Sequence, residues 1–187
     1  MDSFPPIEQE QRFGNKAFRQ WYDKLEEDYI TYINFLTKDE DLIIELQSYF
    51  LDCFGSSKRI DYGTGHELNF LCILYILVCV KYFSEEDLSS IVHHVYYRYL
   101  LLCRKLQITY KLEPAGSRGI WGLDDFQFLC FAFGASELID HKEILPSSIT
   151  NKEILGKYSD DYMFLGCVKF ILEVNILLFT IYQYLNR

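Results

Sequence analysis

Apolar residues recur at spacings of three and four along most of the chain, a pattern that predicts amphipathic helices. Asn15 is a suitable N-cap for the first of these helices. Its apolar face consists of Phe18, Trp21, Tyr22, Leu25, Tyr29, Tyr32 and Phe35. A capping box of Thr37 and Glu40 predicts a second helix, which Gly55 ends. The chain therefore opens with two amphipathic helices.

Two longer helical segments are expected in the middle of the chain. Residues 68–83 are apolar nearly all round, which predicts a central helix enclosed by others. Ser84 with Asp87 caps the longest helix, whose outward face holds Arg98, Arg104 and Lys105. Its inward stripe consists of Leu88, Val92, Val95, Tyr99, Leu102, Leu106 and Tyr110.

The remaining helices are expected to be shorter. Asp124 or Asp125 begins one that Gly134 closes, Thr150 with Glu153 resembles a capping box, and Ser159 caps the last. No segment shows the sustained alternation of apolar and polar residues that a half-buried strand needs. The predicted fold class is therefore all-α, in a single helical domain.

Two glycine-rich strings interrupt the helical pattern, RIDYGTGHE at residues 59–67 and PAGSRGIWGLDD at 114–125. Each runs into an expected helix, where unpaired amide N–H groups and the helix dipole favour anions. Together they predict a phosphate or carboxylate site, to which Arg59 adds a bidentate phosphate donor. A simple helix-capping loop remains the alternative, because no lysine follows the glycines as a P-loop requires. Asp61 is expected to orient Arg59 or to cap the loop.

Other candidate residues each have a structural alternative. Taken alone, the pair Asp124 and Asp125 is read as an acidic pair favoured by the dipole of a helix N-terminus. Trp121 either lines a peptide groove or packs its own glycine loop down. The histidine-containing pairs His66–Glu67 and His93–His94 are read as structural, since adjacent residues on a helix point in different directions.

Composition excludes several classes of partner. With 27 acidic and 18 basic residues the formal net charge is -9, and no basic cluster suited to nucleic acid is visible. The longest apolar run, residues 70–80, is shorter than the roughly 20 residues that span a bilayer, and no secretory signal is expected. The six cysteines stand singly in apolar segments, which predicts reduced, buried thiols in an intracellular protein.

The two glycine strings, together with FGNKAFRQWY at 13–22 and DDYMFL at 160–165, resemble the phosphotyrosyl phosphatase activator family, also called the protein phosphatase 2A activator family. The likeness covers roughly residues 13–173. It implies an all-α core of the activator type over 13–173, lacking the family's N-terminal and C-terminal helical portions. Residues 1–12 are then a polar, mobile lead-in, and residues 174–187 a divergent apolar tail.

The resemblance also assigns site residues. It implies that Arg59, Thr64 and Gly65 contact the phosphates of ATP, and that Asp125 with the Gly119 backbone holds Mg²⁺. Trp121 and Asp124 are candidates for a groove that takes proline-containing peptide segments. No catalytic residue is assigned.

The implied function is ATP- and magnesium-dependent activation of serine/threonine protein phosphatase 2A, with peptidyl-prolyl cis/trans isomerase activity. The implied partner is the phosphatase catalytic subunit with its scaffold, in the cytoplasm and also the nucleus, and a homodimer is a further expectation. The alternative is a truncated, catalytically inactive helical protein that binds the phosphatase or itself.

Overall fold

The computed structural model describes residues 1–11, 13–116 and 124–173. They form two compact units, of which the first is Met1–Gln127 and the second begins at Phe128. Within the described residues, no helix combines the length and the apolar character needed to cross a membrane.

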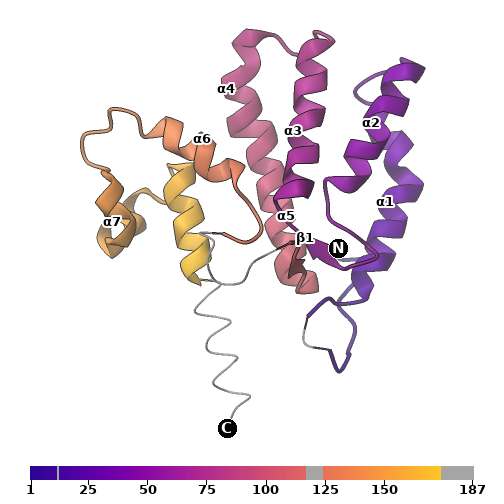
Figure 1. Cartoon of the computed structure of the whole chain (residues 1–187), viewed down its shortest axis with the longest axis horizontal. Helices are drawn as coiled ribbons and strands as arrows, with labels where there is room; N and C mark the ends of the chain where they lie inside the picture. Colours follow the sequence, from indigo (N-terminus) through magenta and orange to yellow (C-terminus); the bar gives the residue numbers. More distant parts are fainter. Residues whose placement is uncertain (12, 117–123, 174–187) are drawn as a thin grey trace. The chain divides into compact units, whose positions relative to one another are not determined.

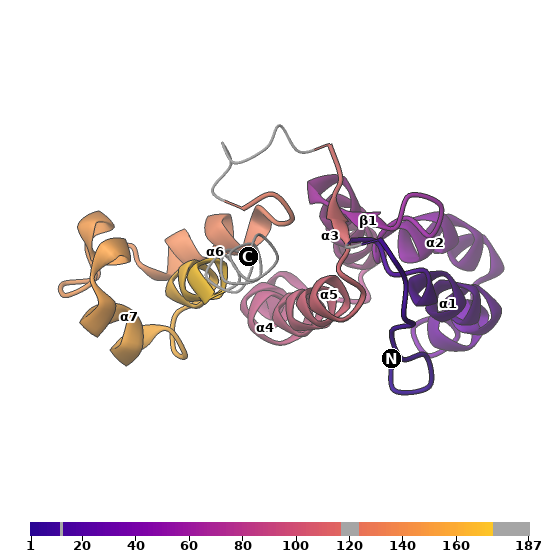
Figure 2. The same cartoon turned by 90° about the horizontal axis from the view of Figure 1, so that it is seen from below.

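The first unit is a bundle of neighbouring helices (Figures 1 and 2). It contains α1 (Ala17–Ile33), α2 (Glu40–Asp52), α3 (Thr64–Cys79), and a helical run that ends in α5. That run comprises the 3₁₀ turn Glu85–Asp87, α4 (Leu88–Ser90), a π-helical stretch Ile91–Tyr96, and α5 (Tyr97–Tyr110). The predicted all-α class is confirmed, since the only described strands are β1 (Asp61–Tyr62) and β2 (Glu113–Pro114).

The second unit contains α6 (Leu129–Glu137), a 3₁₀ turn at Pro146–Thr150, α7 (Lys152–Tyr158), and helical residues 163–173. Gly134 lets α6 approach the last helix so closely that a Cβ there would lie 2.8 Å from the Cα of Phe164. The sequence predicted that Gly134 would end its helix. This prediction is wrong, because the glycine serves interhelical packing instead.

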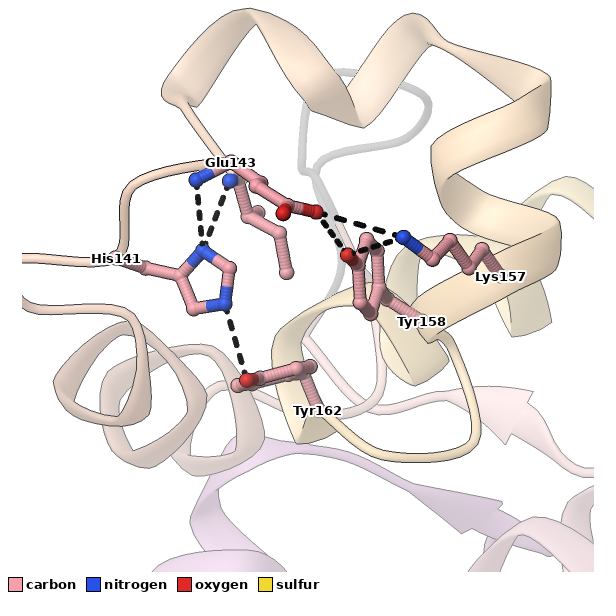
Figure 3. A network of polar contacts seen from close by, with 6 residues as sticks. His141, Glu143, Lys157, Tyr158 and Tyr162 are labelled. Carbon is pink, nitrogen blue, oxygen red and sulfur yellow. Dashed lines mark hydrogen bonds and ion pairs between the residues drawn. The ribbon is translucent and has the colours of Figure 1, made fainter.

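A polar network fixes the connector between α6 and α7 (Figure 3). The Nδ1 atom of His141 accepts hydrogen bonds from the amides of Glu143 and Ile144, at 3.2 and 2.9 Å. Because Nδ1 accepts, the ring hydrogen lies on Nε2, which donates to the Tyr162 hydroxyl at 3.0 Å. The Tyr158 hydroxyl donates to Glu143, which also pairs with Lys157. Side chains of the connector itself, of α7 and of Tyr162 thus hold the conformation of the connector.

The helix starts confirm one predicted cap and correct three. The Ser84–Asp87 capping box is present, with the Ser84 amide 2.8 Å from Asp87 Oδ2. Asp39 caps α2 and Asn151 caps α7, each accepting two amide hydrogen bonds, so the Thr37 and Thr150 assignments are wrong. Asp39 and Asn151 stand directly before the first helical residue, and their side-chain oxygens therefore reach the amides of the first turn. The last helix starts at residue 163 rather than after Ser159.

The predicted inward stripe of the longest helix is confirmed in α5, where Tyr99, Leu106 and Tyr110 are buried, but it fails before α5. Arg104 was expected to face outward and is only 8 % exposed, whereas Val95 was expected inside and is exposed. The π-helical stretch inserts an extra residue per turn, which rotates the residues on either side of it out of a common 3.6-residue register. The helix α3 also differs from expectation, because Leu68 and Tyr75 on its surface are exposed rather than enclosed.

Candidate functional site

A tight turn presents Arg59. The Ser56 amide donates to Asp61 O at 3.0 Å, and the Ile60 amide donates to Ser56 O at 2.7 Å. Ile60 has a φ of 56°, a costly conformation for a β-branched residue. Its side chain is buried, so packing holds the strained turn in place. The turn is therefore a preformed feature of the fold.

The turn joins Arg59 to Asp61, as the sequence suggested. Arg59 Nε donates to Asp61 Oδ2 at 2.6 Å, and this hydrogen bond, with the charge of Asp61, raises the pKa of Arg59. The arginine side chain is 61 % exposed, whereas that of Asp61 is 12 % exposed. Within the described part of the chain, neither terminal nitrogen of the guanidinium has a hydrogen-bond partner. An anion can therefore take these two donors while Asp61 keeps Nε.

His66 lies behind this pair. Its Nδ1 is 2.5 Å from Asp52 O, and because a carbonyl only accepts, Nδ1 carries the hydrogen. Its Nε2 lies 3.8 Å from Asp61 Oδ1. Among residues 1–11, 13–116 and 124–173, no three His, Cys, Asp or Glu side chains gather closely enough to hold a metal ion. The Asp52 carbonyl therefore holds the His66 ring, and no described residue forms a hydrogen bond with Asp61 Oδ1.

Thr64 and Gly65 form the first turn of α3, and both are exposed. The amides of His66 and Glu67 bond to Gly63 O, whereas those of Thr64 and Gly65 have no intrahelical acceptor. A Cβ at Gly65 would meet nothing within 4 Å, so the space in front of this turn is open. This helix start suits an anion because its amides and dipole are accessible.

The two glycine strings meet through the short parallel sheet. Register pairs Asp61 with Glu113 and Tyr62 with Pro114, and the Ala115 amide donates to Tyr62 O at 2.8 Å. Gly63 is required here, since a Cβ would lie 2.8 Å from the Ala115 carbonyl oxygen. Backbone pairing therefore places the beginning of the second glycine string beside the part of the first string that leads into α3.

The second string is described only at its two ends. Gly119 and Trp121 lie outside the described residues, so their predicted roles remain predictions. Asp124 was expected to begin a helix, and it instead accepts the amides of Phe126 and Gln127 at 2.7 and 3.2 Å, while α6 starts at Leu129. Burial raises the pKa of Asp124, although the two amides and Arg104 partly offset the effect. Its neighbour Asp125 is half-buried.

A buried polar network joins α3 and β1 to the helical run that ends in α5, and sequence reasoning missed it. Glu67 is 1 % exposed and accepts a hydrogen bond from the Tyr96 hydroxyl at 2.6 Å. The Tyr62 and Tyr99 hydroxyls lie 2.8 Å apart, and Tyr99 donates to Cys53 O at 2.7 Å. Burial raises the pKa of the Cys103 thiol to about 12 beside these hydroxyls. The sequence did contain a signal for this network, because Glu67 places a carboxylate in the first turn of an otherwise apolar helix.

Comparison with known proteins gives a consistent picture. The model of a family described as "Phosphotyrosyl phosphate activator (PTPA) protein" matches residues 1–182. A probable serine/threonine-protein phosphatase 2A activator 2 of Dictyostelium discoideum is 44 % identical over 183 residues, covering 91 % of this chain and 39 % of the relative. The serine/threonine-protein phosphatase 2A activator of Drosophila melanogaster is 42 % identical over 173 residues, covering 91 % of this chain and 44 % of the relative.

The crystal structure of the PP2A phosphatase activator Ypa1 matches with a TM-score of 0.75 at 33 % identity. The match covers 92 % of this chain and 55 % of that structure. This chain thus spans about half the length, or less, of the relatives that it matches.

Proposed function

This chain belongs to the phosphotyrosyl phosphatase activator (PTPA) family, and from that premise we propose that it binds ATP with Mg²⁺ and activates protein phosphatase 2A. The proposed activity includes cis/trans isomerisation of X-Pro bonds. The relatives carry the activator name, and this chain covers only part of their length.

The observation that carries the nucleotide proposal is the exposed Arg59 guanidinium on the turn that leads into the start of α3. Asp61 holds the guanidinium through Nε, which leaves its two terminal nitrogens for phosphate oxygens. Thr64 adds a hydroxyl, and Gly65 adds an amide at a helix N-terminus. Guanidinium, hydroxyl and amide donors are the groups that a polyphosphate needs.

The proposed Mg²⁺ position uses Asp125 with the carbonyl of Gly119. Asp124 is already occupied by the amides of Phe126 and Gln127, so Asp125 is the carboxylate better placed to serve a cation. Mg²⁺ usually takes only one or two protein carboxylates and shares the phosphates of its nucleotide. The ion, when bound, would neutralise phosphate charge.

The isomerase part of the proposal needs no nucleophile. Rotation about an amide faces a barrier of about 18–20 kcal/mol. A pocket that excludes water weakens amide resonance, because the planar ground state is more polar than the twisted transition state. We place the proline-containing peptide against Trp121 and Asp124, and assign no catalytic residue.

Thermal unfolding with and without Mg²⁺ and ATP tests the nucleotide site. A ligand at 100 times its Kd stabilises the folded state by about 2.7 kcal/mol. For a chain of this size that raises Tm by about 5–10 °C. We expect this shift in the wild type and in Arg98→Ala, which removes an exposed arginine of α5, but not in Arg59→Ala. A shift of equal size in Arg59→Ala would contradict the proposed phosphate contact.

A second experiment separates an activator from a passive binder. Reactivation of an inactive phosphatase 2A core enzyme, its catalytic subunit with the scaffold, is measured with the wild type and with Arg59→Ala. Loss of reactivation with retained phosphatase binding supports the ATP-dependent activator. Binding without reactivation by either protein favours the catalytically inactive, phosphatase-binding alternative.

A further inference from the structure

One oxygen of the Asp61 carboxylate is buried without a hydrogen-bond donor among the described residues. Asp61 Oδ2 accepts from Arg59 Nε at 2.6 Å, whereas Oδ1 has no partner. A buried acceptor without a hydrogen bond costs free energy, because it has lost water and gained no donor in exchange. Asp61 can therefore accept one further hydrogen bond at Oδ1.

The imidazole ring of His66 approaches this oxygen. Its Nε2 lies 3.8 Å from Asp61 Oδ1, and both side chains are only 12 % exposed. The Asp52 carbonyl fixes the hydrogen of the neutral ring on Nδ1, so Nε2 presents a lone pair to the lone pairs of Oδ1. A proton on Nε2 converts this contact into a donor and an acceptor of opposite charge. The separation is about 1 Å longer than a charge-assisted hydrogen bond, so a small approach completes it.

The other groups around the ring have contacts of their own. The charged and titratable residues near it are Asp52, Arg59, Asp61, Tyr62, Glu67 and Tyr99. The Tyr62 ring stacks on the imidazole, with centroids 5.8 Å apart and planes at 28°. The Tyr99 hydroxyl lies 3.4 Å from the backbone oxygen of His66, and Glu67 accepts from the Tyr96 hydroxyl. Asp61 is thus the group that faces Nε2.

We propose that His66 is a positioning residue for the phosphate site, and that its imidazolium form donates from Nε2 to Asp61 Oδ1. The carboxylate is then held at both oxygens. It keeps Arg59 Nε in place while the two terminal nitrogens of the guanidinium are presented to phosphate. This inference rests on the proposed binding of ATP at Arg59, and it makes the proton a regulator of that site.

Protonation of His66 and phosphate binding favour each other for two electrostatic reasons. The negative charge of Asp61 beside the guanidinium repels phosphate, and an imidazolium next to Asp61 offsets this repulsion. His66 also lies in the first turn of α3, where the helix dipole disfavours a cation and a bound phosphate compensates. The coupling is reciprocal, so binding of ATP also promotes uptake of the proton. Histidine side chains change charge between pH 5 and 8, so the affinity for ATP rises as pH falls across this range.

Isothermal titration calorimetry of the full chain with Mg²⁺ and ATP at pH 8 and pH 6 tests this coupling. The variant His66→Asn keeps a donor for Asp52 O and removes the nitrogen that faces Asp61. Protonation of ATP itself affects both proteins equally and cancels in the ratio of their Kd values. We expect the ratio of the variant Kd to the wild-type Kd to be at least threefold larger at pH 6 than at pH 8. The control His94→Asn removes an exposed histidine and should give the same ratio at both pH values. An equal ratio at both pH values for His66→Asn would overturn the proposal.

The variant His66→Gln separates the hydrogen bond from the charge. Its side-chain amide can donate to Asp61 Oδ1 at every pH. At pH 8 it should therefore bind Mg²⁺ and ATP at least threefold more tightly than His66→Asn, and the ratio of the two Kd values should not increase at pH 6. A folded His66→Gln that binds as weakly as His66→Asn at pH 8 would overturn the role of the hydrogen bond to Asp61.

A measurement without nucleotide distinguishes failure of this inference from failure of the proposed function. In nuclear magnetic resonance spectra of ¹⁵N-histidine-labelled protein at pH 6, the Nε2 hydrogen of His66 should exchange at least tenfold more slowly in the wild type than in Asp61→Asn. The signal of the exposed His94 should be the same in both proteins. Equal exchange of the His66 hydrogen in the two proteins would overturn its bond to Asp61. Slow exchange in a wild type that binds no ATP at either pH would instead contradict the proposed ATP site, and with it the coupling of that site to the proton.

Discussion

Replacing Gly134 by alanine should destabilise the second unit. Gly134 is buried in α6, and a Cβ there would meet the backbone of Phe164 in the last helix, with Cα at 2.8 Å and Cβ at 2.9 Å. The Phe164 amide nitrogen would be closer still. Backbone atoms cannot rotate away as the end of a side chain can, so the two helices must move apart.

The magnitude follows from two opposing effects. Alanine in place of glycine inside a helix contributes about 0.8–1 kcal/mol of stability. Overpacking a core by one carbon costs about 1–3 kcal/mol, and the backbone contact places this site at the upper end. The net loss is therefore about 2 kcal/mol, which lowers Tm by about 4–8 °C for a chain of this length.

Gly156 provides a matched control. It is exposed within α7, and a Cβ there would meet nothing within 4 Å. Gly156→Ala should keep only the favourable helix contribution and raise Tm slightly. Thermal unfolding followed by circular dichroism at the helical signal measures both variants. The close approach of α6 to the last helix would be refuted if Gly134→Ala melted at or above the wild-type temperature.

Two further predictions concern the first unit. Gly63→Ala places a Cβ 2.8 Å from Ala115 O and should separate β1 from β2, which costs about 1–3 kcal/mol and abolishes the Tm shift caused by Mg²⁺ and ATP. The control Gly65→Ala should change the free energy of unfolding by less than about 1 kcal/mol. Equal Tm values for the two variants would contradict the pairing of β1 with β2. Hydrogen bonds from the Ser84 amide and hydroxyl lower the pKa of Asp87, so its contribution is present above the ordinary value of 3.8 and lost as pH falls through the lower folded value. Asp87→Asn should therefore lower Tm at pH 6 and much less at pH 3, and a Tm difference independent of pH would count against this role of the carboxylate.

Local sequence determined the helices and some of their boundaries. Helical periodicity involves apolar residues only three or four positions apart, so the sequence alone predicted α1, α2 and α5. The Ser84–Asp87 capping box was found for the same reason. The two glycine strings also identified the family, because each contains its motif in consecutive residues.

Tertiary structure decided what depends on residues far apart in sequence. The pairing of β1 with β2 joins strings about 50 residues apart, and two-residue strands are too short to leave an alternating pattern. The π-helical stretch Ile91–Tyr96 separates the exposed Leu88 from the buried stripe of α5, which a regular 3.6-residue period cannot show. The sequence predicted a mobile lead-in, but Asn15 Nδ2 donates to Ile7 O and the Tyr110 hydroxyl donates to Phe4 O. These contacts are invisible in the sequence, because they involve backbone atoms that every residue possesses.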